Sequence, residues 1–368
     1  NYRGASRVFG WSFYSQGVRE QTAASAETFI AAALRFFGDA DPSVGSAWDK
    51  GARLAHWVGS QRALLVLDGL EPLQSPHAAD RGKLRDPAME ALLRGLARAS
   101  SGLCLITTRE PLADLADRPN VARHDLEQIT PSAGRALLRT AGVVGADAEL
   151  QHLASRFGPH ALAVSLLGVY LYAHPGHGVA PAEQLEPLPG AQPIDRVLAG
   201  FDLMLGDSPP RDTLRLLGLF DRPASADCLA ALRQAPAIPG LTEHLVGIDE
   251  AAWTRTLARL EKLRLIHVQQ GESGPAAVDA HPLIREHYAT LLKSGVAWRA
   301  AHRRIYEHLC ATTQEGEQPS LEDLQPLYQA VAHGCLAGMQ QQARAKVYRD
   351  RILRGQEFYS TRKLGAFG

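Results

Sequence analysis

The sequence predicts an α/β domain with a parallel sheet, followed by an all-α region. Strands and helices alternate up to about residue 130, which is the pattern of a parallel sheet covered by helices. Strands then become rare, except that residues 250–288 read as helix, strand, turn, strand, helix, the outline of a winged helix. We expect an α/β domain at 1–130, a helical domain at 131–192, a winged-helix domain at 193–294 and a helical region at 295–368.

The expected elements of the first domain follow from apolar runs and from helix-end signals. Helices are expected at 25–38, where Gly38 closes the helix, and at 48–58. Two more helices begin where an N-cap residue precedes proline, at Asp86 and at Thr130. The expected strands are RVFGWSFY (7–14), ALLVL (63–67) and GLCLITTR (102–109), and VARHDLEQI (121–129) is a candidate for a short fourth strand.

Composition and charge narrow the class of protein. A chain of 368 residues with 45% hydrophobic and 21% charged residues is globular and long enough for two to four domains. Its formal net charge of +0 gives no global attraction to nucleic acid or to an anionic membrane. The four cysteines are scattered without a C-x-x-C pair, which favours reduced thiols in the cytoplasm. The most apolar stretch, 160–174, is too short to span a bilayer and is expected to be a buried helix.

The stretch ALLVLDGLEPLQ (63–74) carries the first candidate site residues. Asp68 ends an apolar strand, where a carboxylate can hold Mg²⁺ through water because magnesium prefers oxygen ligands and keeps its hydration shell. Gly69 allows the backbone to turn sharply, and Glu71 can orient or deprotonate an attacking water. The alternative is that Asp68 only caps a turn after a buried strand.

The stretch ITTRE (106–110) strengthens the interpretation of Asp68 as a magnesium ligand. Thr107, Thr108 and Arg109 follow a second apolar strand, one helix after Asp68. The Arg109 guanidinium can stabilise the charge of a γ-phosphate through charge-assisted hydrogen bonds. The alternative for Arg109 is a surface ion pair with Glu110 or another acid. An Asp-terminated strand followed by a strand ending in Thr-Thr-Arg is more specific than either motif alone.

The ordered motifs LLVLDGLE, LITTRE, FGPHALAVSLLG and DAHPLIREHY resemble those of STAND nucleotide switches, the signalling P-loop NTPases that include NB-ARC and NACHT proteins. The resemblance covers roughly residues 7–290. It implies a truncated P-loop NTPase core that uses ATP, ADP and Mg²⁺. Asp68 would be the magnesium aspartate, Glu71 the acid that follows it and Arg109 the sensor arginine, with Thr108 beside it as a nucleotide contact.

Two further nucleotide contacts are implied by the same resemblance. Pro159 matches the proline of a G-x-P-x-A-L motif and would pack on the adenine, although the glycine stands one position late, at Gly158. His281 matches the winged-helix histidine that contacts the β-phosphate of ADP, with Pro282 where that family has aspartate. The residues themselves allow simpler interpretations: Gly158 closes one helix, Pro159 starts the next, and His281 caps the helix PLIREHY.

No G-x-x-x-x-G-K-[ST] loop occurs in the 368 residues, although such a loop is central to triphosphate binding. Residues 7–17 resemble the strand that follows this loop and its helix. We therefore expect the loop to lie upstream in a longer parent protein. That parent would be a slow ATPase, whereas the chain itself would not hydrolyse ATP.

The resemblance implies a switch that is closed with ADP and that oligomerises with ATP. Its partners would be other copies of itself, a trigger sensed by tetratricopeptide-like repeats that begin at residue 295, and an effector domain outside the chain. Bacterial defence or programmed cell death is a plausible setting. No membrane is expected as a partner.

Two other functions stay open. A transcription regulator would bind DNA through the basic residues of the helix at 254–265, but Glu261 and the neutral net charge disfavour DNA. A degenerate scaffold would bind no nucleotide. Zinc is not expected, because neither the cysteines nor the 14 histidines show zinc-site spacing.

Overall fold

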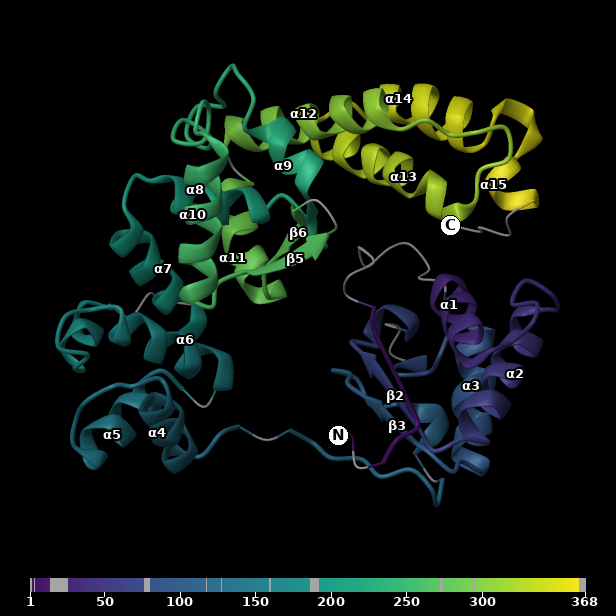
Figure 1. The fold of residues 1–368 in the computed structure, drawn as a ribbon, viewed down its shortest axis with the longest axis horizontal. Coiled ribbons are helices and arrows are strands. Elements are labelled where there is room, and N and C mark those ends of the chain that lie inside the picture. The colour runs from purple at the N-terminus through teal and green to yellow at the C-terminus, as the bar shows by residue number, and fades with distance from the viewer. Residues whose placement is uncertain are drawn as a thin grey trace. The chain divides into compact units, whose positions relative to one another are not determined.

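The computed structural model describes residues 2, 4–13, 26–75, 80–116, 118–126, 128–158, 160–185, 192–271, 274–293 and 295–363. The chain forms two compact units, Asn1–Asp125 and Leu126–Ala366 (Figure 1), whose positions relative to each other are not determined. None of the helices in the described part of the chain combines the length and the apolar character needed to cross a bilayer.

The first unit contains a three-stranded parallel sheet with the strand order β1-β2-β3. Its strands are β1 (Arg7–Ser12), β2 (Ala63–Asp68) and β3 (Leu103–Ile106). The helices of the unit are α1 (Glu27–Phe37), α2 (Ala47–Gly59) and α3 (Pro87–Arg98), with short 3₁₀ turns at η2 (Glu71–Leu73) and η4 (Ala113–Leu115). The predicted parallel α/β pattern of strands and helices is therefore confirmed.

Local signals in the sequence set the helix ends of this unit. Gly38 closes α1 in the left-handed conformation, with φ of 97°. The Asp86 carboxylate caps α3 by accepting hydrogen bonds from the backbone N–H groups of Ala88 and Met89. The predicted fourth strand is wrong: residues 121–126 are irregular and exposed, and Leu126 is 95% exposed, so no neighbouring strand covers them.

The two faces of the sheet differ in burial. On β2, Leu65 and Leu67 are fully buried in a core shared with the helices. Leu64 and Val66 alternate with them and are only half-buried. In the register of the sheet these two residues pair with Leu103 and Leu105 of β3, which are 61% and 51% exposed. Within the described residues, β3 is an edge strand that presents leucines to solvent.

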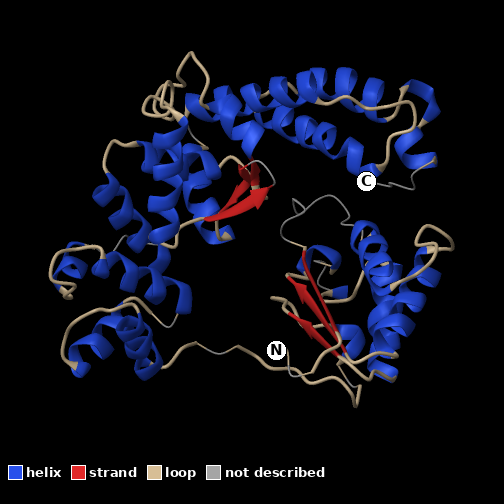
Figure 2. Ribbon diagram, in the orientation of Figure 1, coloured by secondary structure: helices blue, strands red, loops and turns tan. Residues whose placement is uncertain are grey.

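The second unit is mostly helical (Figure 2). Its elements are α4 (Pro131–Thr140), α5 (Asp147–Arg156), α6 (Ala161–Tyr172), η5 (Ala180–Gln184), α7 (Pro193–Leu205), α8 (Pro209–Leu217), β4 (Ala224–Ser225), α9 (Ala226–Leu232), α10 (Glu250–Lys262), β5 (His267–Gly271), β6 (Gly274–Asp279), α11 (Pro282–Leu292), α12 (Val296–Thr312), α13 (Leu321–Leu336), α14 (Gln340–Gln342), the π-helical η6 (Ala343–Ile352), η7 (Gly355–Glu357) and α15 (Tyr359–Arg362).

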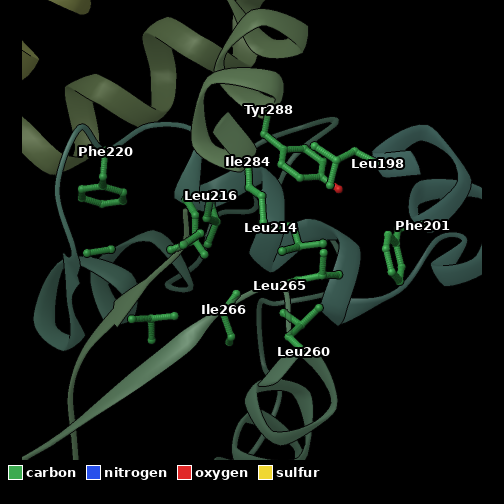
Figure 3. Packing of buried hydrophobic residues seen from close by; sticks show 14 of the residues in the cluster. Leu198, Phe201, Leu214, Leu216, Phe220, Leu260, Leu265, Ile266, Ile284 and Tyr288 are labelled. Atoms are coloured by element: carbon green, nitrogen blue, oxygen red, sulfur yellow. The ribbon is translucent and has the colours of Figure 1, made fainter. Parts of the chain in front are cut away.

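The elements expected at 250–288 are present in the expected order. Strands β5 and β6 pair in antiparallel fashion between α10 and α11, and the two-residue strand β4, which the sequence did not indicate, pairs with β6. Leu260 from α10 and Leu265 from the turn after it are buried with Ile284 and Tyr288 from α11 (Figure 3). Tyr288 also donates a hydrogen bond of 3.0 Å from its hydroxyl to Asp202 Oδ1, which connects α11 to α7.

Candidate functional site

The carboxyl ends of the three parallel strands bring three oxygen-bearing side chains together. Asp68 is the last residue of β2, Ser12 pairs with it across the sheet as the last residue of β1, and Thr107 directly follows β3. The Ser12 hydroxyl donates to Asp68 Oδ2 at 3.1 Å, and the Thr107 hydroxyl donates to Asp68 Oδ1 at 2.7 Å. Asp68 is thus held from both neighbouring strands, and its carboxylate faces solvent.

The turn after β2 is fixed by the same threonine. Gly69 has a φ of 70°, which supports the role predicted for it in a sharp turn. Its backbone N–H donates to Thr107 Oγ1 at 2.9 Å, so Thr107 connects the Asp68 carboxylate to the turn that carries it. The sequence placed Thr107 at the strand end, but it did not indicate this connecting role.

Glu71 and Arg109 also meet, through a backbone group. The backbone N–H of Arg109 donates to Glu71 Oε1, so the Glu71 carboxylate holds the loop that follows β3. The other oxygen, Oε2, is buried and accepts no hydrogen bond from a described group. Glu110, the acid considered as a partner for Arg109, forms a two-pronged ion pair with Arg81, with N–O distances of 2.8 and 2.6 Å.

Thr108 faces a different partner from Thr107. Its hydroxyl lies 2.5 Å from Gln74 Oε1 and 3.0 Å from the carbonyl oxygen of Glu110. Gln74 is 4% exposed, and its amide donates to the carbonyl oxygens of Gly82 and Glu110 at 3.1 and 3.0 Å. Gln74 is therefore a buried polar link between the segments after β2 and β3. Sequence reasoning missed this residue, because a glutamine after Leu-Glu-Pro-Leu is typical of an ordinary loop.

The remaining candidate residues belong to the second unit. Pro159 lies outside the described residues, whereas Gly158 follows α5 with a φ of 74°, as expected of a glycine that closes a helix. His281 is the N-cap of α11, and its Nδ1 accepts a hydrogen bond of 3.2 Å from the backbone N–H of Leu283. The helix-cap interpretation of His281 is confirmed, and its contact with nucleotide stays a prediction. Asp68 belongs to the first unit and His281 to the second.

The group at the sheet edge suits a hard cation. The side chains of Ser12, Asp68 and Thr107 offer only oxygen atoms, which are the ligands that Mg²⁺ prefers. Asp68 is exposed, so a hydrated ion can reach its carboxylate. These residues therefore fit a magnesium ion held partly through water.

One solved structure shares the architecture of nearly the whole chain. The STAND (Signal Transduction ATPase with Numerous Domains) protein with a tetratricopeptide repeat sensor from Pyrococcus horikoshii aligns over 94% of this chain with a TM-score of 0.54 and 14% identity. The alignment covers 45% of that protein, so this chain spans less than half of its length. This similarity supports a fold like that of the P-loop NTPases.

The Walker-type ATPase of Pyrococcus abyssi matches 77% of this chain and 84% of its own length, at 12% identity. Its TM-score of 0.31 is too low to support any conclusion about this fold. No protein-family model and no curated protein match the sequence.

Proposed function

We propose that the chain is part of a nucleotide-dependent switch of the STAND type. The observation that carries the proposal is the position of Asp68, at the carboxyl end of the central strand and hydrogen-bonded to hydroxyls from both neighbouring strands. In open parallel sheets, ligands bind outside the carboxyl ends of the strands. The fold shared with a STAND ATPase makes a nucleotide the favoured ligand.

In this proposal Asp68 holds Mg²⁺ through water, and the loop carrying Arg109 faces the phosphates. The bond from the Arg109 backbone to Glu71 couples that loop to the turn after Asp68. Glu71 therefore acts in positioning the loop and is a weaker candidate for activating water. His281 and Pro159 would complete the site in the ADP-bound state, with α10, β5, β6 and α11 acting as a winged helix that closes on the nucleotide.

Binding of a nucleotide triphosphate at this edge of the sheet requires a phosphate-binding loop. The exposed leucines of β3 support a place for it, because a further parallel strand beside β3 would pair with its free edge and cover them. We propose that such a strand carries the loop in the active protein. ATP binding would then open the module for self-association, with α12 and α13 belonging to a tetratricopeptide-like sensor and the effector domain outside the chain.

The test is the nucleotide released when the purified protein is denatured, measured by chromatography. It is done on this chain and on any longer protein that the gene encodes. Near-stoichiometric ADP in the longer protein is the expected result. An empty protein whose melting temperature does not rise with Mg-ATP or Mg-ADP would instead favour the degenerate scaffold.

The role of Asp68 is tested in the form that binds nucleotide. A ligand at a hundred times its dissociation constant stabilises a protein by about 2.7 kcal/mol. We expect Asp68→Asn to remove the magnesium-dependent part of this stabilisation and to abolish ATP hydrolysis. Asp125→Asn is the matched control, because Asp125 is an exposed surface acid that forms an ion pair with Arg123. Undiminished turnover in Asp68→Asn would refute the magnesium role.

One observation supports the alternative function, which is DNA binding. Arg255, Arg259 and Lys262 are exposed on α10, while Leu257 and Leu260 are buried. Salt-dependent retention on DNA that is lost in Arg259→Ala/Lys262→Ala would favour this function. Absence of retention at low salt would leave the basic residues as a solvated helix face.

A further inference from the structure

Three side chains with different donor atoms meet where α9 packs on α12. Asp227 and Cys228 lie in the first turn of α9, and His308 lies on α12. Their carboxylate oxygen, sulfur and imidazole nitrogen all lie within 4.8 Å of one another. The closest pair is His308 Nε2 and Asp227 Oδ2, at 3.1 Å.

The donor set selects the kind of ion that fits. A thiolate, an imidazole and a carboxylate together suit a borderline cation such as Zn²⁺, whereas Mg²⁺ and Ca²⁺ take oxygen ligands alone. Ser225 forms side-chain hydrogen bonds with both Asp227 and Cys228. An outer hydrogen-bonding partner of this kind orients metal ligands in known sites.

The cluster is also accessible. A pocket of about 330 Å³ opens beside it and is lined in part by Ser225, Asp227, Leu309 and Gln329. The Asp227 side chain is 58% exposed and that of His308 is 19% exposed. An ion can therefore enter from the pocket, and water can fill a fourth coordination position.

We propose that Asp227, Cys228 and His308 bind one zinc ion, with water as the fourth ligand. The site is independent of the nucleotide site. A bound ion would connect α9 to α12, and Asp227 and His308 are 81 positions apart in the chain. These helices belong to the regions expected to be the winged helix and the start of the helical repeats, so the ion would hold the two regions together.

Zinc binding releases the proton of the Cys228 thiol, because the thiolate is the form that binds the metal. Burial raises the pKa of this thiol to about 11; the Asp227 carboxylate acts in the same direction, and the hydrogen bond with Ser225 lowers the pKa. The proposal itself rests on the position of the three donor atoms.

The test is a titration of the whole chain with Co²⁺, followed by displacement with Zn²⁺. We expect one Co²⁺ per chain and an absorption band for charge transfer from thiolate to cobalt. Cys228→Ser should lose the band, and His308→Gln should weaken binding by more than about tenfold. Cys310→Ser is the matched control, since Cys310 is a half-buried thiol on the same helix as His308 and contacts Tyr306.

Three outcomes would refute the zinc site. The first is the absence of a charge-transfer band in the folded wild-type chain. The others are a band that persists in Cys228→Ser and a band that disappears in Cys310→Ser. Cys228 is 1% exposed, so its substitution can affect folding, which circular dichroism would reveal. His308→Gln alters a partly exposed side chain and keeps the test decisive, because unchanged affinity in that folded variant would exclude His308 as a ligand and refute the site.

Discussion

Replacing Thr107 with valine tests whether this threonine organises the edge of the sheet. Valine keeps the size and branching of threonine but removes the hydroxyl. The substitution therefore removes the donor to Asp68 Oδ1, at 2.7 Å, and the acceptor for the backbone N–H of Gly69, at 2.9 Å. The bond from Ser12 to Asp68 remains, so the carboxylate keeps one partner from the protein.

The expected loss comes mostly from Gly69. This residue is buried, and leaving a buried N–H without a partner costs about 1–3 kcal/mol. The bond to Asp68 adds about 0.5 kcal/mol, the low end of the usual range, because Thr107 and Asp68 are both exposed. We therefore expect Thr107→Val to destabilise the first unit by about 2 kcal/mol, or about 30-fold in the equilibrium between closed and open forms.

Cys104 provides the assay. It is the only cysteine of the first unit, it is half-buried on β3, and its surroundings raise the pKa of its thiol to about 12, so little reactive thiolate is present in the closed form. Its labelling by a thiol reagent, followed by mass spectrometry of the Cys104 peptide, therefore reports opening of this unit. Thr107→Ser keeps the hydroxyl and should label at close to the wild-type rate. A change of less than threefold in Thr107→Val, or equal effects of valine and serine, would refute the reasoning.

Three further predictions concern the same unit. Gly51→Ala should cost about 1–3 kcal/mol in urea unfolding, because the added Cβ would lie 2.1 Å from the carbonyl oxygen of Ala88 and push α2 away from α3; a neutral effect would mean that the helices are not packed this closely. Asp86→Ala should cost about 2 kcal/mol in urea unfolding, because Asp86 caps α3 and also accepts a hydrogen bond of 2.8 Å from the backbone N–H of Ala26. Asp86→Asn keeps a side-chain oxygen that can cap the helix and should therefore cost less. Equal losses of stability in the two variants would contradict the capping role. Leu105→Thr should change the free energy of unfolding by less than about 0.5 kcal/mol, because Leu105 is half-exposed. The same substitution should reduce self-association of this chain, as measured by light scattering. A large loss of stability would show that the β3 edge is covered.

Local signals in the sequence accounted for much of the first unit. Gly38 and Asp86 end and begin helices through bonds to backbone groups a few residues away, so their neighbours in sequence determine their roles. Asp68 was also predictable, because an acid after an apolar run in a βαβ pattern falls at the carboxyl edge of the sheet. The prediction of a strand at 121–129 was wrong because a strand needs a pairing partner as well as a suitable sequence. Within the described residues no strand lies beside this segment.

The sequence by itself determined where the three parallel strands and the helices of the first unit lie and which acid stands at the sheet edge. Only the tertiary structure decided that Thr107 contacts Asp68 while Thr108 turns to Gln74, because the register of β2 and β3 sets which hydroxyl faces the carboxylate. It likewise decided that Asp227 and Cys228 meet His308, a grouping that no spacing in the sequence indicates. Such contacts depend on how separate elements pack, whereas helix caps and strand ends depend on residues that are already neighbours in the chain.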